Sequence, residues 1–229
     1  MTSRISTIFS FALVVTCTQS ISWGATVPQD FVNCISIPSD PRTACTLPPH
    51  PQNDPYLIGP GQVLQIAKSG IVVQGGGVNR ADTTLRRSQA ANYPLMRVPY
   101  GVNNVSINGL LFDGNRGGLS SYRCLTAVSG LAELDISGSY GSVVSADFDS
   151  SPWFSLLAGS STFINNSRFT RARIGGVYGT GGTNVIYVYN QFENNGVNAI
   201  FVGNGALLLT VTRKRRNLNI GRPVPFGMA

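Results

Sequence analysis

Two aspartates in the second half of the chain are the residues best placed to do chemistry. Asp147 and Asp149 are two positions apart, so both side chains point to the same side if the segment is extended. Asp135 lies about one repeat earlier and is expected to face solvent. Carboxylates grouped in this way could provide the acid and base for polysaccharide cleavage, or could bind Ca²⁺. The simpler alternative is a set of solvated loop aspartates.

Three arginines follow these aspartates. Arg168, Arg171 and Arg173 could hold the carboxylates of an acidic glycan through paired hydrogen bonds, or could form salt bridges with the aspartates. Trp153 offers an aromatic face on which a sugar ring could stack. The predicted catalytic residues are therefore Asp147, Asp149 and Arg171, and the predicted substrate-binding residues are Asp135, Arg168, Arg173 and Trp153.

Other chemistries lack the residues that they need. The one histidine, His50, lies in a Pro-rich segment, and no Cys/His spacing typical of zinc sites occurs. Gly75-Gly76-Gly77 lacks the Lys and Ser or Thr of a phosphate loop, and there is no nucleophile elbow. A Gly-rich Asp nonapeptide repeat is also missing. No metal ligand is predicted, and Ca²⁺ at the aspartates is the one cofactor left open.

The distribution of charge argues against a nucleic-acid partner. The formal net charge is +7, but five basic residues lie in the last 17 positions. Apart from these and Arg4, the chain holds 11 basic and 10 acidic residues. A nucleic-acid surface would spread Lys and Arg over the folded body, with aromatic residues between them. We therefore expect no binding to nucleic acid.

The composition favours strands over helices as the elements that position these side chains. Charged residues make up 12% of the chain, too few for the solvent-facing sides of long amphipathic helices. A short pattern recurs instead: an apolar residue, any residue, an apolar residue, and a larger apolar residue five positions later. The clear copies are Ile71-Val72-Val73 with Val78, Val105-Ser106-Ile107 with Phe112, Thr162-Phe163-Ile164 with Phe169, and Val185-Ile186-Tyr187 with Phe192. Leu134-Asp135-Ile136 and Leu207-Leu208-Leu209 are weaker copies.

The spacing of these copies is typical of a solenoid. Successive copies are 22 to 34 residues apart, and each coil of a solenoid must return its strand above the previous one. Residues that tolerate sharp bends follow the copies, at Asn108-Gly109, Gly114-Asn115, Asn165-Asn166, Asn194-Asn195-Gly196 and Asn204-Gly205. The sequence therefore predicts an all-β, right-handed parallel β-helix of about six coils over residues 61–212, preceded by a cap segment at 26–60.

The first 25 residues have the organisation of an export signal. Arg4 precedes the apolar run Ile5–Val15, and small and polar residues follow as far as Ala25. The run is too short to span a bilayer, so we expect a secreted protein, extracellular or periplasmic, without a membrane span. In an oxidising compartment Cys34 and Cys45 could form a local disulfide, which would leave Cys124 as a buried free thiol.

Several stretches resemble the opening turns of pectate-lyase-superfamily β-helix proteins. They are Leu47-Pro48-Pro49, Tyr56 with Ile58, Ser69–Gly77, Thr83–Arg86 and Val102–Arg116, and the resemblance covers roughly residues 43–205. It implies the fold more specifically than an activity, because these stretches are the family's structural strands and turns. Lyases of the family use an Arg or Lys base with a cation, and hydrolases use two carboxylates. The Gly-His-Gly, Arg-Ile-Lys and Trp-Ile-Asp-His segments of its active members do not occur here.

Three hypotheses about function follow. The leading one is a secreted, monomeric protein associated with polysaccharide, with an acidic glycan as one candidate. Its action as a lyase or hydrolase is left open. The second is a non-catalytic surface or adhesive module that binds glycan. The third is a truncated, inactive family member, because Leu207-Leu208-Leu209 would cap the last coil poorly. Residues 213–229, which begin with Arg213-Lys214-Arg215-Arg216, are predicted to be a disordered basic tail.

Overall fold

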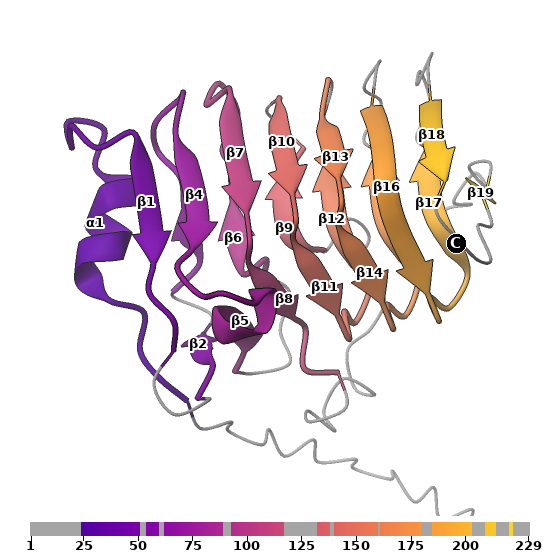
Figure 1. Cartoon of the computed structure of the whole chain (residues 1–229), viewed down its shortest axis with the longest axis horizontal. Coiled ribbons are helices and arrows are strands. Elements are labelled where there is room, and N and C mark those ends of the chain that lie inside the picture. Colours follow the sequence, from indigo (N-terminus) through magenta and orange to yellow (C-terminus); the bar gives the residue numbers. More distant parts are fainter. Residues whose placement is uncertain are drawn as a thin grey trace, which may run out of the picture.

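The chain forms a parallel β-helix, in which short strands stack side by side along one axis (Figure 1). The structure is a computed structural model that describes residues 24–50, 54–59, 62–88, 93–116, 132–137, 140–159, 161–179, 185–202, 209–213 and 220–221. Residues 1–23 of the expected export signal, Cys124 and most of the basic tail lie outside these residues. Within the described ranges, no helix is long and apolar enough to cross a membrane.

Three parallel sheets run along the stack, and the chain visits them in a fixed order. Sheet I contains β1 (Ala44–Leu47), β4 (Val72–Gly75), β7 (Val105–Asn108), β10 (Gly141–Val144), β13 (Phe163–Asn165), the start of β16 (Val185–Glu193) and β18 (Leu209–Arg213). Sheet II contains β2 (Tyr56–Ile58), β5 (Thr84–Arg87), β8 (Leu111–Asp113), β11 (Asp147–Asp149), β14 (Arg168–Thr170) and the end of β16. Sheet III contains β3 (Leu64–Gln65), β6 (Met96–Arg97), β9 (Ala132–Ile136), β12 (Phe154–Ala158), β15 (Gly175–Gly179), β17 (Asn198–Val202) and β19 (Ile220–Gly221).

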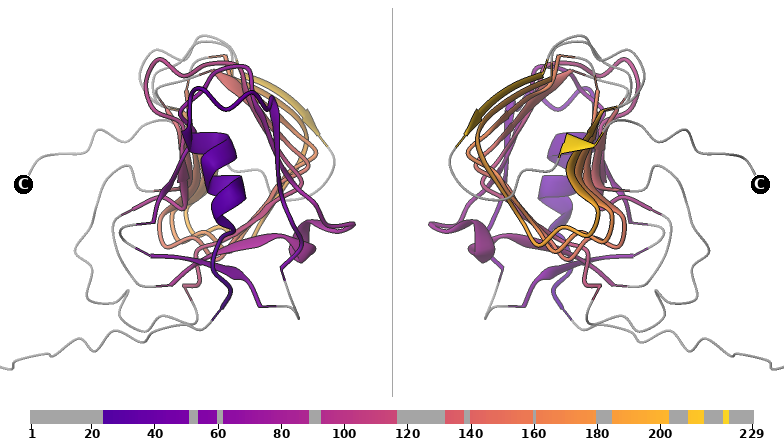
Figure 2. Two further views of the ribbon diagram at one scale, coloured as in Figure 1. Left: turned by 90° about the vertical axis from the view of Figure 1, so that its left-hand side faces the viewer. Right: turned by 90° about the vertical axis from the view of Figure 1, so that its right-hand side faces the viewer.

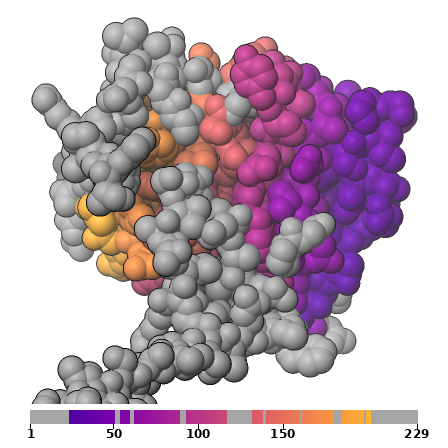
Figure 3. Space-filling model, turned by 180° about the vertical axis from the view of Figure 1, so that it is seen from behind, coloured from indigo at the N-terminus to yellow at the C-terminus, as the bar shows by residue number. Residues whose placement is uncertain are grey.

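The strands of neighbouring coils pair in register along the stack, apart from a shift between Val188 and Asn190 where β16 pairs with β18. In the space-filling view the coils follow one another from indigo at the N-terminal end to yellow at the C-terminal end (Figure 3). Pairing already begins at β1, which lies beside β4, so the stack starts at Ala44, within the stretch expected to form the cap. In the described part of the chain, the strands of sheet I mark seven coils, where the repeat suggested about six.

Residues with a left-handed backbone make the corners between the sheets. Between sheets I and II they are Gly109, Ser145, Asn166 and Tyr189, and between sheets II and III they are Asn115, Ser150, Arg171 and Asn194. Asn and Gly adopt this conformation at low cost, which is why they mark the corners in the sequence. The structure confirms the expected corners at Gly109, Asn115, Asn166 and Asn194.

A ladder of phenylalanines fills the inner side of sheet II. Phe112, Phe148, Phe169 and Phe192 occupy the same position in four successive coils. Their rings stack with centroids 4.8–4.9 Å apart, which is the spacing between neighbouring strands. The repeat correctly predicted three of these residues, and the structure adds Phe148.

The structure corrects the register of three predicted copies. Leu134-Asp135-Ile136 belongs to sheet III, and the residue between Ile107 and Ile164 in sheet I is Val143. Its strand begins with Gly141 rather than an apolar residue, because a Cβ there would lie 2.2 Å from the Val105 carbonyl oxygen. Leu85, not the exposed Val78, precedes Phe112 in the ladder. In the last copy, the residue paired with Tyr187 is Val211, and Leu209 pairs with Val185.

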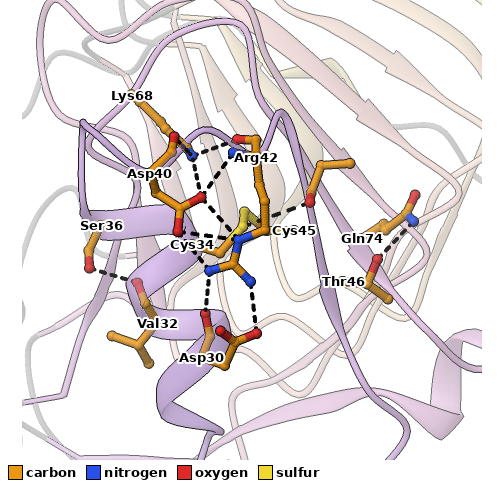
Figure 4. Close-up of a disulfide and its surroundings, with 11 residues drawn as sticks. Asp30, Val32, Cys34, Ser36, Asp40, Arg42, Cys45, Thr46, Lys68 and Gln74 are labelled. Atoms are coloured by element: carbon orange, nitrogen blue, oxygen red, sulfur yellow. Dashed lines mark hydrogen bonds and ion pairs between the residues drawn. A yellow bond between two sulfur atoms is a disulfide. The ribbon is translucent and has the colours of Figure 1, made fainter.

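The amphipathic helix α1 (Gln29–Ser36) lies across the N-terminal end of the stack (Figure 2). Phe31, Cys34 and Ile35 on its inner face are buried and belong to the same apolar core as the first coil. A disulfide joins Cys34 to Cys45 of β1 and confirms the pairing suggested by the sequence (Figure 4). The helix therefore covers the interior that the first coil would otherwise expose to water.

Charged groups strengthen the same junction. The Arg42 guanidinium donates hydrogen bonds to Asp30 at the start of the helix, at 2.8 Å, and to Asp40 at 2.7 Å. Lys68 donates to the carbonyl oxygens of Asp40 and Arg42 (Figure 4). The Arg42 hydrogen bonds hold the pKa of the Asp40 carboxyl well below its usual range.

Removing the disulfide is expected to loosen this cap. Replacing Cys34 and Cys45 together with alanine should lower the free energy of unfolding by about 3 kcal/mol, because the crosslink restricts the unfolded chain over a separation of 11 residues. Urea unfolding with and without a reductant measures the effect. Reductant should move the wild-type midpoint close to that of the double variant and leave the variant unchanged. An unchanged wild-type midpoint would contradict the prediction.

Candidate functional site

The outer face of sheet II carries most of the predicted functional residues. On β11 and β14, Phe148 and Phe169 point into the core, so the residues on either side of each point outward. Parallel pairing places Asp147 beside Arg168 and Asp149 beside Thr170. The sequence predicted that both carboxylates share one side of the strand, and the strand geometry gives them that arrangement.

Asp147 lies between two arginines that reach it from different coils. Arg168 Nη2 donates a hydrogen bond to its carboxylate at 3.1 Å, and Arg80 Nη1 donates to the other oxygen. Arg80 belongs to a short 3-10 helix, Arg80–Asp82, that precedes β5. The Asp147 side chain is only 14% exposed, whereas that of Arg168 is 49% exposed. Two cations thus flank one carboxylate, and one of them remains open to solvent.

Asp149 is held by its neighbours in the following coil. Thr170 Oγ1 donates to it at 2.8 Å, and Arg171 Nε donates at 2.7 Å. Partial burial alone would raise the pKa of Asp149, but these hydrogen bonds outweigh it and lower the pKa. The same hydrogen bond to Asp149 raises the pKa of Arg171. Arg168 and Arg171 therefore form the expected salt bridges with Asp147 and Asp149, whereas Arg173 contacts Trp153 instead.

A third carboxylate continues this row toward the N-terminal end. Asp113 lies opposite Asp149 in the preceding coil, and Arg86 Nε donates to it at 2.8 Å. The position of Arg86 could have been predicted from the sequence, because alternation along the strand Thr84–Arg87 puts Leu85 inside and Arg86 outside. No sequence signal points to Arg80, which is 67 residues away from Asp147.

The remaining predicted residues belong to the third sheet and its corner. Asp135 on β9 pairs with Arg97 on β6 at 3.2 Å. The guanidinium carbon of Arg173 lies 5.0 Å from the centre of the Trp153 ring, a cation–π contact. Trp153 is itself buried with Phe154 and Leu157 in an apolar cluster separate from the main core. The seven predicted residues therefore divide into a group on sheet II and a group on sheet III.

The three aspartates considered for a Ca²⁺ site lie on two different sheets. Asp135 does not join Asp147 and Asp149, since it lies on a different sheet. Across the ranges that the structure describes, no three His, Cys, Asp or Glu side chains are grouped closely enough to hold a metal ion. Calcium binding stays a prediction from the sequence.

An open pocket of about 250 Å³ adjoins Asp147 at the corner between sheets I and II. Its lining combines two cations, one carboxylate, one aromatic ring and three uncharged polar side chains: Arg80, Arg168, Asp147, Tyr189, Asn166, Ser167 and Gln191. These residues come from the 3-10 helix and from three successive coils at the C-terminal half of the stack. The pocket can therefore offer hydrogen bonds of both kinds together with an aromatic face.

Comparison with solved structures supports the fold. A chain described as a "putative glycosyl hydrolase" from Parabacteroides merdae is similar with a TM-score of 0.52 and 10% sequence identity, over 79% of this chain and 83% of that one. A second chain, ORF18 of Geobacillus virus E2, has a TM-score of 0.31 and 13% identity over 75% of this chain and 36% of that one. At such low identity the first similarity concerns the fold alone, and the second carries no argument. No protein-family model and no curated protein matches the chain.

Proposed function

We propose that the protein binds polysaccharide along the outer face of sheet II, with the pocket around Asp147 as its main binding site. The pocket is the observation that carries this proposal. Sugar recognition needs polar side chains that fix the hydroxyl groups and an aromatic face that covers the apolar side of the ring. Arg168, Asn166 and Gln191 line one cavity and supply the polar groups. The exposed ring of Tyr189 at the edge of the cavity supplies the aromatic face.

The charge of the pocket favours an acidic glycan. Arg80 and Arg168 face a single carboxylate, Asp147, so the lining has one positive charge in excess. About half of the Arg168 side chain is exposed, which leaves donors available to a ligand. Guanidinium groups pair well with carboxylates because two parallel N–H groups match the two oxygens.

The same electrostatics favour binding over cleavage. A general acid works best when its pKa is raised toward neutrality, but the pKa of Asp149 is lowered by its hydrogen bonds to Arg171 and Thr170. A lyase base must be able to lose its proton, and the pKa of Arg171 is raised by Asp149. We therefore propose that Asp149 and Arg171 position a glycan rather than catalyse its cleavage. We propose the same role for Asp147, because it is paired with both Arg80 and Arg168.

We further propose that the protein is an exported relative of the pectate-lyase superfamily. The organisation of residues 1–25 supports export, and a disulfide at Cys34–Cys45 suits an oxidising compartment. The stretches quoted for the family resemblance support membership, and the fold neighbour described as a glycosyl hydrolase agrees with a carbohydrate ligand.

Retention on an acidic glycan tests the proposal. In affinity electrophoresis through gels that contain polygalacturonate, the wild-type chain should be retarded, and less so as salt is added. Arg168→Gln should weaken the retardation about ten-fold, because a charge-assisted hydrogen bond to the ligand is lost. Assays for unsaturated uronide and for new reducing ends should show no product.

Arg97→Gln is the matched control. Arg97 forms a similarly exposed pair with Asp135, at 3.2 Å compared with 3.1 Å for Arg168 and Asp147, but on sheet III. Its loss should leave retardation unchanged. Equal weakening by both variants would show that charge alone acts, and lack of wild-type retardation would refute the proposal. Product formation would show that the site is catalytic.

A further inference from the structure

Tyr189 occupies a corner position that an aromatic residue rarely takes. Four residues pair with one another in successive coils of sheet I: Asn108, Val144, Asn165 and Val188. The residue that follows each of them therefore occupies the same corner of its coil. These corner residues are Gly109, Ser145, Asn166 and Tyr189, with φ of 60°, 50°, 48° and 52°. The left-handed conformation suits Gly and Asn, and it is strained for a bulky side chain.

Contacts among the described residues do not explain this choice of residue. The Tyr189 side chain is 56% exposed, so its ring adds little to the core. Within the part of the chain that the structure describes, the ring stacks on no other aromatic residue, and the hydroxyl makes no hydrogen bond. Asn166, one coil earlier, shows that the same corner forms with a residue better suited to it.

The position of the Tyr189 ring suggests a reason for its strained backbone. Tyr189 lines the pocket together with Arg80, Asp147, Arg168 and Gln191. A residue at this corner is held rigidly, because the preceding and following segments of β16 are paired with the neighbouring coil. Strained residues that the rest of the fold keeps in place are common at binding sites.

We infer that Tyr189 is the sugar-stacking residue of the pocket, retained at the expense of stability because its ring must lie beside the Asp147–Arg168 pair. The inference rests on the proposed function and adds a residue and a role to it. A sugar ring would stack its apolar face on the tyrosine while an anionic group of the sugar meets Arg168. Stacking on a fixed ring limits the loss of conformational freedom on binding.

The experiment exploits the opposite signs that stability and binding should show. Tyr189→Asn gives the corner the residue of the preceding coil, so the melting temperature should rise by roughly 2–4 °C. Retardation in polygalacturonate gels should weaken about five- to ten-fold, because the stacking face is lost. Tyr189→Phe keeps the ring and the strain, so it should retain wild-type melting temperature and retardation.

Ser150→Asn is the control. Ser150 has a φ of 53° at the corner on the opposite edge of sheet II and does not line the pocket, so retardation should not change. Unchanged retardation of Tyr189→Asn beside weakened retardation of Arg168→Gln would overturn this inference alone. A lowered melting temperature of Tyr189→Asn would also overturn it, since the ring would then support the fold. A wild-type chain that is not retarded would refute the proposed function and this inference with it.

Discussion

Replacing Glu133 with alanine is expected to lower the free energy of unfolding by about 3–5 kcal/mol. Glu133 and Arg87 form an ion pair at 2.7 Å in which both side chains are completely buried. Their strands, β9 and β5, belong to successive coils, so the pair links two coils through the interior. Loss of the carboxylate would leave the Arg87 guanidinium as an uncompensated charge in the core, which is the source of the large cost.

Arg87 and Glu133 are also affected by other groups in the interior. The Arg87 guanidinium also donates to the Tyr93 carbonyl oxygen and lies 4.7 Å from the centre of the Tyr93 ring. Burial raises the pKa of Glu133, and the neighbouring Arg87 opposes that shift. Because both groups are buried, an isolated charge at either position is costly.

Urea unfolding of three variants measures this effect. Glu133→Ala should lower the midpoint strongly, whereas Asp135→Ala, two residues along the same strand, should cost no more than about 1 kcal/mol because its pair with Arg97 is partly exposed. Arg87→Met combined with Glu133→Leu should recover most of the stability, since a well-packed apolar pair avoids buried charge. A double variant less stable than Glu133→Ala would contradict this account.

Phe148→Ala is expected to cost a similar amount, about 3–5 kcal/mol, through the loss of a buried ring and the cavity that it leaves. Phe148 is fully buried, and it stacks on Phe112 at 4.9 Å and on Phe169 at 4.8 Å. Its removal therefore interrupts the ladder on both sides. The flanking strands cannot close the gap, because backbone pairing fixes their spacing.

Thermal and urea unfolding of matched phenylalanine variants test this prediction. Phe148→Leu keeps most of the volume and should cost less than about 1.5 kcal/mol. Phe163→Ala, on the partly exposed outer side of sheet I, should also cost far less than Phe148→Ala. Equal losses for Phe148→Ala and Phe163→Ala would show that the ladder is not a special source of stability.

The local features of the fold could be predicted from the sequence. Alternation of apolar residues marks a strand with one buried side, and Asn or Gly marks a left-handed corner, because both depend on only a few neighbouring residues. Val105–Asn108 and Asn166 are predicted on these grounds, and the structure confirms them. The Cys34–Cys45 disulfide, expected because the two cysteines are close in an exported chain, is confirmed as well. That Asp147 and Asp149 share one face follows from the same two-residue period.

The sequence pattern does not show which strands pair between neighbouring coils. That pairing depends on how the loops close each coil. Every coil contains three short apolar stretches of similar pattern, so Leu134-Asp135-Ile136 looked equivalent to strands that lie on another sheet. The true spacing in sheet I varies between 21 residues, from Val143 to Ile164, and 36 residues, from Ile107 to Val143. A fixed period could not find that register, because loops of different length close coils of the same shape.

In the site on sheet II, features within one strand could be predicted, whereas contacts between coils could not. The two-residue period of a strand is enough to predict that Asp147 and Asp149 point to the same side. Only the tertiary structure brought Arg80 to Asp147, moved Asp135 to another sheet and set Tyr189 in a strained corner beside the pocket. These contacts join residues from different coils, and their partners are chosen by the stacking of coils rather than by any local pattern.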